Sequence, residues 1–193
     1  MTSQRGTSLI EVLVTMVILA FGLLGAAGLQ ARLQLADMEA YQRAQALILV
    51  DDIASRIATN RTNAAAYVTT AANPLGTGMV PGCPSPAPPA TLQQTDAAQW
   101  CNALLGVAEV AGANKVGAML GARGCVEILG PAANKEYLIT VAWQGLAPVS
   151  APPASVACGA NLYDGAAGST SSNCTADRCR RVVTTVVRIG GLT

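Results

Sequence analysis

The sequence predicts an α+β protein in which a long N-terminal α-helical spine packs on a small antiparallel β-sheet head with disulfides. Three observations support this prediction. An uncharged apolar run near the N-terminus continues into a segment with helical spacing, and the first proline is Pro74. Three β-rich segments follow between residue 125 and the C-terminus. All six cysteines lie beyond the long N-terminal helix, and this number of cysteines in one region is typical of a domain in an oxidising compartment.

The composition excludes several functional classes. The 193 residues carry a net charge of +1, and a chain with so few Lys and Arg has no electrostatic footprint for nucleic acid. The absence of histidine removes Ser-His-Asp and Cys-His catalysis and every His-ligated metal site. The sequence also has no Cys-x-x-Cys pair and no acidic pair with a spacing for acid–base catalysis. We therefore predict no enzyme, no cofactor and no metal site.

The apolar run extends from Val12 to Ala31 and contains 20 residues without a charge. As a helix it is about 30 Å long, which matches the hydrocarbon core of a bilayer. We therefore predict a transmembrane segment over about residues 10–31. The alternative is a cleaved signal peptide, although the run is longer than the apolar region of about 7–15 residues in such peptides, and no clean Ala-x-Ala site ends it.

Two residues in front of the apolar run are unusual for an ordinary membrane anchor. Glu11 lies at the edge of the run, where a carboxylate is costly unless it is paired. Gly6 ends a short polar stretch that carries one positive charge, Arg5, and four residues separate Gly6 from Glu11. This constellation of glycine, glutamate and uncharged helix resembles the N-terminus of type IV prepilins, a family that includes the pseudopilins of type II secretion.

The resemblance implies a role for each of these residues. In the family a prepilin peptidase cuts after the glycine and methylates the new N-terminal amine. The matching cleavage here lies between Gly6 and Thr7, with N-methylation of Thr7, and residues 1–6 are then the prepilin leader. Thr7 stands where the family usually has phenylalanine. Glu11 matches the glutamate that pairs with the N-terminal amine of a neighbouring subunit during assembly.

The helix is predicted to continue beyond the membrane segment, so that residues 7–59 form one spine of roughly 80 Å. Apolar residues recur in steps of three or four, which predicts the stripe that packs under the head. This stripe comprises Leu33, Ala36, Ala40, Ala44, Leu47, Val50, Ala54 and Ile57. Gln42 is among the polar residues predicted on the opposite face. Three glycines punctuate the apolar half and let helices approach closely: Gly22, Gly25 and Gly28.

Residues 60–193 are predicted to form a globular head in the periplasm. We expect residues 60–72 to be a fraying helix end and a loop. Residues 73–90 contain six of the ten prolines, so we expect an extended surface loop there. Residues 95–105 are predicted to form a short helix that covers one end of the sheet, because its apolar residues have helical spacing at Ala98, Cys101 and Leu105.

The β-rich segments span residues 125–129, 137–144 and 180–189, with a turn over residues 130–135 between the first two. We predict that they form an antiparallel sheet laid on the amphipathic half of the spine. The apolar stripe of the spine would then be the second layer of the core.

The six cysteines are disulfide candidates, and their pairing is only partly determined by the sequence. Cys83–Cys101 is the favoured bond, because both residues flank one loop that nothing else would hold. Closing that loop is worth about 3 kcal/mol in the chain-entropy model. Three further cysteines lie in or beside one Gly/Ser-rich loop: Cys158, Cys174 and Cys179. We expect two of these three to form a disulfide with each other and the remaining one to pair with Cys125.

The C-terminal part extends the resemblance. Residues 139–144, a cysteine-bearing loop and a final strand resemble the PilV-type minor type IV pilins, which also share the start seen at residues 10–14. This implies a minor type IV pilin that takes part in pilus assembly or initiation, with roles in a tip complex, adhesion or twitching motility. The implied partners are other minor and major pilins, the prepilin peptidase, the inner-membrane assembly platform and the lipid bilayer. The implied location is the bacterial inner membrane, as a single-pass protein, and then the assembled pilus at the cell surface.

Two alternatives remain open at this point. A minor pseudopilin of type II secretion has the same architecture, although such heads tend to be smaller. A membrane-anchored periplasmic enzyme or binding protein is the other alternative, and the absence of histidine and of a polar cluster argues against it.

Overall fold

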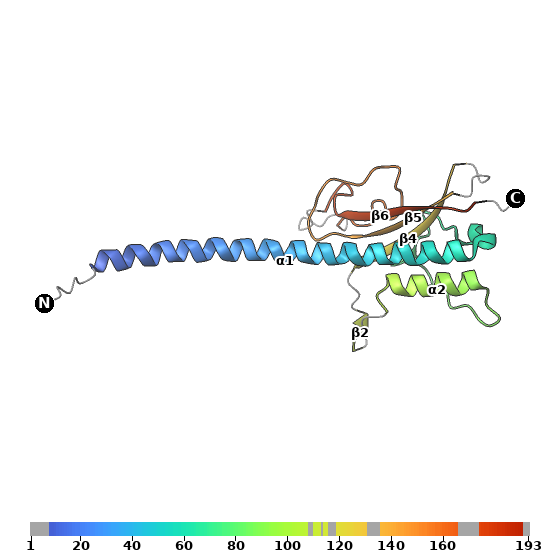
Figure 1. Cartoon of the computed structure of the whole chain (residues 1–193), viewed down its shortest axis with the longest axis horizontal. Helices are drawn as coiled ribbons and strands as arrows, with labels where there is room; N and C mark the ends of the chain where they lie inside the picture. The colour runs from blue at the N-terminus through green and yellow to red at the C-terminus, as the bar shows by residue number, and fades with distance from the viewer. Residues whose placement is uncertain are drawn as a thin grey trace. The chain divides into compact units, whose positions relative to one another are not determined.

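The structure is a computed structural model, and it describes residues 8–107, 110–112, 114–115, 119–130, 136–165 and 174–190 (Figure 1). Contacts within the chain divide it into two units, Met1–Ala40 and Tyr41–Thr193. The first element, helix α1, extends over Leu9–Thr59 and contributes to both units. The sequence favours this long helix because it lacks proline, and because Glu11 in the first turn and Arg56 in the last turn complement the helix dipole.

The second unit contains the remaining elements. They are the 3₁₀ helix η1 (Arg61–Tyr67), strand β1 (Leu75–Gly76), helix α2 (Leu92–Leu104), strands β2 (Val110–Ala111) and β3 (Asn114–Lys115), and the longer strands β4 (Leu120–Leu129), β5 (Glu136–Gln144) and β6 (Arg180–Arg188). The main sheet is antiparallel with the order β1-β4-β5-β6, and β2 pairs with β3 separately. The predicted α+β fold, with a helix on an antiparallel sheet of three C-terminal strands, is confirmed.

Strand β5 is the centre of the head because it pairs on both sides. Ile139 on this strand lies opposite Val126 of β4 and Thr185 of β6. Alternate side chains of β5 point toward the helices and are buried, as expected for a strand with one face on the core. These core side chains are Tyr137, Ile139, Val141 and Trp143.

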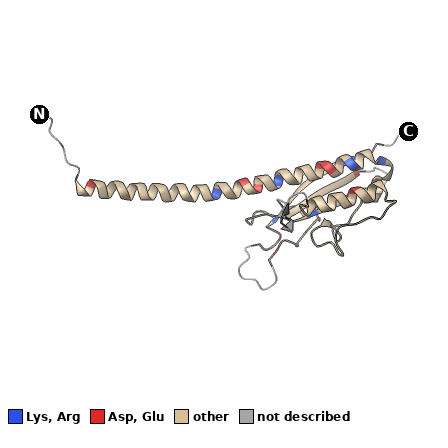
Figure 2. Cartoon of the chain, turned by 90° about the horizontal axis from the view of Figure 1, so that it is seen from below, with Lys and Arg blue, Asp and Glu red and all other residues tan. Residues whose placement is uncertain are grey.

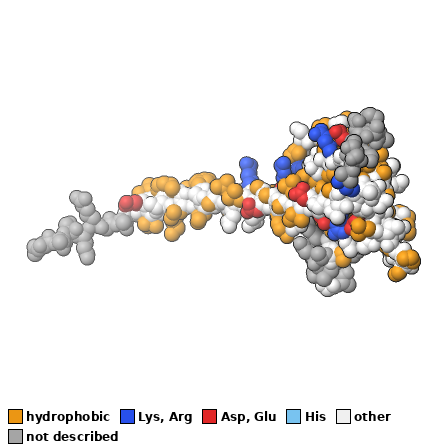
Figure 3. Space-filling model, turned by 45° about the vertical axis from the view of Figure 1, so that its right-hand side comes forward, with side chains coloured by type: hydrophobic (Ala, Val, Ile, Leu, Met, Phe, Trp, Pro, Cys, Tyr) orange, Lys and Arg blue, Asp and Glu red, His pale blue; other side chains and the backbone are white. Residues whose placement is uncertain are grey.

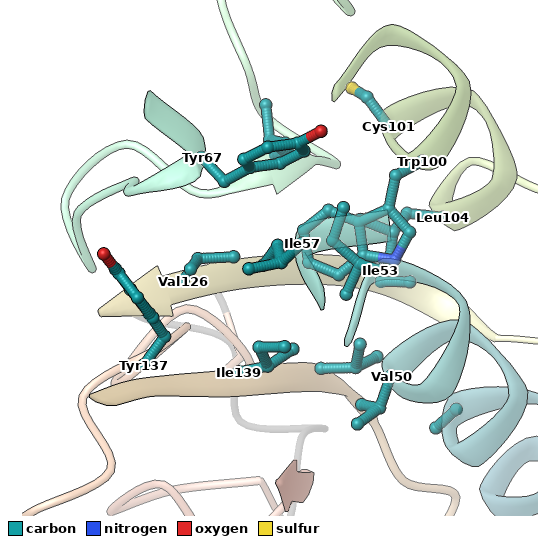
Figure 4. Close-up of a cluster of buried hydrophobic side chains, with 14 of the residues drawn as sticks. Val50, Ile53, Ile57, Tyr67, Trp100, Cys101, Leu104, Val126, Tyr137 and Ile139 are labelled. Atoms are coloured by element: carbon teal, nitrogen blue, oxygen red, sulfur yellow. The ribbon is translucent and has the colours of Figure 1, made fainter. Parts of the chain in front are cut away.

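The part of α1 in the second unit supplies the other layer of this core. Figure 4 shows Val50, Ile53 and Ile57 between the helix and the strands. The buried side chains of α1 follow steps of three and four residues, which is the helical repeat. They are Gln42, Ala46, Val50, Ile53 and Ile57.

The predicted stripe was therefore wrong in its phase. Val50 and Ile57 are buried as expected, but Leu47 is 46% exposed and Ala44 is exposed as well. Gln42, expected on the polar face, is buried instead. The reason is that Ala46 and Ile53 are apolar too, so two overlapping stripes exist in this segment. The sheet covers the stripe that contains Ala46 and Ile53.

Helix α2 begins earlier than predicted, and of its predicted apolar positions Cys101 is fully buried whereas Ala98 and Leu105 are only partly buried. A reciprocal capping box between Thr91 and Gln94 fixes its start, which the sequence analysis had placed at residue 95. The buried residues of α2 include Trp100 and Leu104, whereas Leu105 is already the C-cap.

Trp100 joins three layers of the head. Its indole Nε1 donates a hydrogen bond to the carbonyl oxygen of Leu49 on α1, at 2.9 Å. Its ring lies over Gly124 of β4, where an added Cβ would be only 2.3 Å from the ring. Position 124 therefore has to be glycine for α2 to pack this closely on the sheet.

Two connecting segments differ from the expected loops. Residues 61–67 form η1 rather than a frayed end, and its Tyr67 and Ala64 are buried in the core. The proline-rich segment 73–90 contains β1, whose residue Leu75 pairs with Gly124 at the edge of the sheet. The turn expected over residues 130–135 lies outside the described residues after Gly130.

We expect Ile53→Ala to lower the free energy of unfolding of the head by about 2–5 kcal/mol, because it leaves a cavity between α1 and the sheet. The matched control Leu47→Ala removes an exposed side chain of the same helix, and a change within about 0.5 kcal/mol is expected. The measurement is denaturant unfolding of the full chain in detergent, followed by tryptophan fluorescence. Both tryptophans, Trp100 and Trp143, are buried in the head. Equal losses in the two variants would contradict the observed phase of the stripe.

Candidate functional site

The N-terminal end of α1 holds one of the predicted site residues. The carbonyl oxygen of Ser8 accepts hydrogen bonds from the backbone N–H groups of Glu11 and Val12, at 3.0 and 3.3 Å. Glu11 thus lies in the first turn of the helix, where the dipole favours a negative charge. Its side chain is exposed, and none of the described residues forms an ion pair with it. Gly6 and Thr7 lie outside the described residues.

The surface of α1 that follows Glu11 is apolar on all sides. Figure 3 shows hydrophobic side chains along this part of the helix, and Figure 2 shows an uncharged stretch after the first acidic residue. The large side chains are exposed, from Leu9 at 84% to Leu29 at 60%. The most apolar 18-residue window has a mean hydropathy of 2.5, and none of it is buried. By length and composition this helix is able to cross a membrane.

Three glycines lie on this apolar surface and pack against no other part of the described chain. A Cβ added at any of them would meet no atom within 4 Å; they are Gly22, Gly25 and Gly28. Glycine lowers helix stability by about 1 kcal/mol relative to alanine. The three glycines therefore leave shallow depressions on the exposed surface of the helix, and a second helix can approach closely there.

The six cysteines form three disulfides, all in the second unit. Cys83–Cys101, the pair favoured by the loop between them, ties the proline-rich segment to α2, with Cα atoms 5.6 Å apart. Cys125–Cys158 ties β4 to the loop after β5, and Cys174–Cys179 closes a short loop before β6. The last two pairs fall within the alternatives that the sequence left open.

A polar cluster that the sequence analysis missed holds α2 and η1 against α1. The Arg56 guanidinium donates to Asp52 at 2.9 Å and to Asp96 of α2 at 2.8 Å. The other carboxylate oxygen of Asp96 accepts a hydrogen bond from the hydroxyl of Tyr67, which also accepts one from Asn60 at 3.0 Å. Asp96 is buried, and it is compensated by these two donors. No sequence signal joined Arg56 to a residue 40 positions away.

The cluster shifts the titration of its phenol. Burial, and then the hydrogen bond to the Asp96 carboxylate, raise the pKa of Tyr67 to about 12. Ionised Tyr67 would leave the bond to Asp96 without its proton and place two negative charges side by side. The cluster therefore holds α1, α2 and η1 together, and it does so only while the phenol of Tyr67 is neutral.

A second polar cluster orders the loops around β6. Arg180 is buried and donates to the Asp177 carboxylate at 2.6 Å and to the carbonyl oxygens of Val156 and Cys158 at 2.7 and 3.1 Å. The same carboxylate accepts a hydrogen bond from the backbone N–H of Asn161. These bonds fix the loop that carries Cys158 on the outer face of the sheet.

The described residues contain no group of three or more His, Cys, Asp or Glu side chains placed to hold a metal ion. The polar clusters around Arg56 and Arg180 are saturated by internal hydrogen bonds and ion pairs. Their arrangement therefore serves the fold, and the exposed helix with Glu11 is the functional candidate.

We expect Tyr67→Phe to lower the free energy of unfolding at neutral pH by about 1–3 kcal/mol, because it leaves an oxygen of buried Asp96 without a donor. Because folding raises the pKa of this phenol, neutral Tyr67 makes its full contribution to stability below about pH 10. That contribution is lost as the pH rises toward 12. Wild-type stability should therefore fall over this range, and Tyr67→Phe should reduce the fall. Denaturant unfolding at several pH values provides the measurement. Tyr41→Phe, at an exposed position, is the control. Equal losses of unfolding free energy in the two variants would refute the role of Tyr67 in holding these elements together.

The comparisons with known proteins concern the N-terminus. Residues 1–27 match the family model described as the prokaryotic N-terminal methylation motif. No curated protein and no solved structure matches the chain. The matched residues include Gly6, Thr7 and Glu11 and the first half of the apolar helix. The chain thus carries the N-terminal signature of type IV prepilins and pseudopilins on a pilin-like α+β fold.

Proposed function

We propose that this protein is a minor type IV pilin, a structural subunit that takes part in the assembly or initiation of a pilus. One observation carries the proposal: Glu11 is a lone carboxylate at the start of a helix that stays uncharged up to Arg32 and is exposed on every side. A helix that is apolar all round requires lipid or other helices as its surroundings. A carboxylate at its start requires a cation in the same surroundings.

Processing at the matched motif is our proposed source of that cation. We propose that residues 1–6 are a leader, that the prepilin peptidase cuts between Gly6 and Thr7, and that the new amine of Thr7 is methylated. Cleavage removes Arg5 and creates a positive charge four residues before Glu11. Residues 7–59 then form the spine, and residues 60–193 form the head.

Pairing between subunits gives Glu11 its mechanism. On insertion scales an unpaired carboxylate costs about 2.5 kcal/mol or more at the bilayer centre. Contact of Glu11 with the Thr7 amine of a neighbouring subunit removes this cost, because the pair forms in a medium of low dielectric constant. The pair also fixes the axial register of two helices whose apolar surfaces pack together. The alternative is that Glu11 lies in the headgroup layer and is merely tolerated.

The location and partners follow from this mechanism. We propose a single pass through the bacterial inner membrane, with the disulfide-bonded head in the periplasm, followed by passage into the pilus at the cell surface. The proposed partners are other minor and major pilins, the prepilin peptidase and the inner-membrane assembly platform. Roles in a tip complex, adhesion or twitching motility, and the PilV-type assignment, belong to the same proposal.

A minor pseudopilin of type II secretion is the second candidate, because the matched motif occurs in both systems. Deletion of the gene distinguishes the two. Loss of surface fibres with normal protein secretion supports the pilin, and the reverse result supports the pseudopilin.

The first prediction of this proposal concerns processing. Mass spectrometry of the protein from its natural cells should show an N-terminus at methylated Thr7, with residues 1–6 removed. Gly6→Val should leave the full-length precursor in the membrane, because the peptidase requires a small residue before the bond. An intact Met1 in assembled fibres, or cleavage near Ala26, would refute the assignment.

The second prediction concerns Glu11. We expect Glu11→Ala to be cleaved normally and to stay in the membrane, yet to lose co-purification with other pilins and to form few fibres in a deletion strain. Glu11→Gln should behave in the same way, because it keeps the size and removes the charge. Asp37→Ala is the control, an exposed acidic residue of α1 beyond the apolar run, and it should assemble normally. Full fibre formation by Glu11→Ala would exclude the docking role.

A further inference from the structure

Strand β6 is a long free edge of the main sheet. Within the described residues it pairs with β5 alone, since the sheet has the order β1-β4-β5-β6. The pairing runs through all nine residues, Arg180–Arg188, without a shift of register. The strand at the opposite edge, β1, has only two residues. An edge strand presents unpaired backbone groups, and an extended chain can add to them as a further strand.

The backbone groups of alternate residues of β6 point away from the sheet. The N–H of Gly145 donates to the carbonyl oxygen of Cys179 at 2.7 Å, and this bond continues the register of β5 and β6. In an antiparallel ladder, hydrogen-bonded pairs alternate with pairs that are not bonded to each other. The odd-numbered residues of β6 therefore bond to β5, and the N–H and C=O groups of the even-numbered ones face the free edge. No described residue bonds to these outward groups at the three central positions, which are Val182, Thr184 and Val186.

The middle of β6 lacks the features that usually protect an edge strand. Residues 182–187 are six consecutive valines and threonines, which favour an extended chain, with no proline and no charge among them. Thr184 and Val186 are exposed on the outer face, the latter at 43%. Val183 and Val187 pack against the core, but they are only partly buried. A strand added beside β6 would cover both faces of this edge, which favours apolar or β-branched residues in that strand.

The charges of β6 and the residues before it are positive. Residues 178–188 contain four arginines and no acidic residue. Two of the arginines bind carboxylates from outside this segment, Asp177 at 2.6 Å and Glu136 at 2.8 Å. If two copies paired through β6, in either direction, arginines of one copy would lie beside arginines of the other and repel them. Carboxylates near the ends of the added strand complement the arginines instead, so the charges favour a different, acidic partner over a second copy.

We propose that β6 is a docking edge for an extended segment of another protein, which adds a fifth strand to the four-stranded sheet. The segment has apolar or β-branched residues in its middle and carboxylates near its ends. Its backbone bonds to the outward groups of Val182, Thr184 and Val186, and its carboxylates lie near Arg181 and Arg188. The main-chain bonds supply affinity, and the charges select the partner. This inference depends on the head alone and is independent of the proposed function.

Hydrogen exchange in the full chain, held in detergent and read by mass spectrometry at single residues, tests the contact with a synthetic probe. The probe is the peptide Glu-Val-Thr-Val-Thr-Val-Glu, and the matched control peptide has lysine in place of both glutamates. At saturation the probe should slow exchange of the amides of Val182, Thr184 and Val186 by about tenfold, because each gains a hydrogen-bond partner. The lysine peptide should bind about tenfold more weakly, since it places like charges together.

Two variants at one position show whether the backbone of the edge carries the contact. Thr184→Pro removes the central outward N–H group, so the probe should no longer protect Val182 and Val186; proline is tolerated at such an edge position. Thr184→Val keeps the N–H group and should bind the probe as the wild type does. The amides of Val183 and Val187 bond to β5, so slow exchange there shows that a variant is folded. If Thr184→Pro does not fold, the exchange of the wild type decides.

Three results would overturn the inference. In the first, the probe leaves exchange of the outward amides unchanged in the wild type. In the second, the lysine peptide binds as tightly as the probe, which would exclude an acidic partner. In the third, the outward amides exchange slowly without any peptide, which would show that a second copy or the chain itself already covers the edge. Each of these results concerns the head only, so processing at Gly6 and assembly through Glu11 would stand.

Discussion

One continuous helix has to satisfy two different surroundings, and the rest of the molecule follows from that constraint. The first part of α1 is apolar on every side, with a hydropathy that suits lipid, whereas its last turns bury one face against a sheet. An apolar face requires a covering layer. The sheet, α2 and η1 provide this layer for residues 42–57, and the membrane or neighbouring helices are left to provide it for the first part.

The polar clusters show how a small head with few charges holds its layers in place. Asp96 of α2 is buried, and its charge is compensated by Arg56 of α1 and by the hydroxyl of Tyr67 of η1. Removal of any one partner leaves a buried group without compensation, which costs more than the net gain of the intact cluster. The cluster therefore determines which elements pack together, while the apolar core supplies the larger part of the stability.

The sequence predicted the elements better than their packing. The helix, the three long strands and the bond between Cys83 and Cys101 follow from local patterns, because proline, β-branched residues and loop length act locally. The phase of the buried stripe did not follow, since Leu47 and Ile53 are both apolar and only the sheet selects between them. The contacts of Asp96 and Arg180 join residues from separate elements, and such pairs leave no periodic signal. At the candidate site, Glu11 was evident because a charge beside a long apolar run is locally unusual.

The long helix also sets the order in which the chain has to fold. Ile57 belongs to the first element, but the core that covers it includes Val187 of the last strand, 130 residues later. At a synthesis rate of roughly 5–20 residues per second, about 7–26 s pass between these two residues. During that interval the sheet that covers the core face of α1 is incomplete, and the unfinished chain carries an apolar surface that is only partly covered. Newly made chains are therefore most vulnerable to proteolysis and misassembly before β6 is in place, and a truncation that removes only this last strand would leave the part of the core beside Val183 and Val187 permanently uncovered.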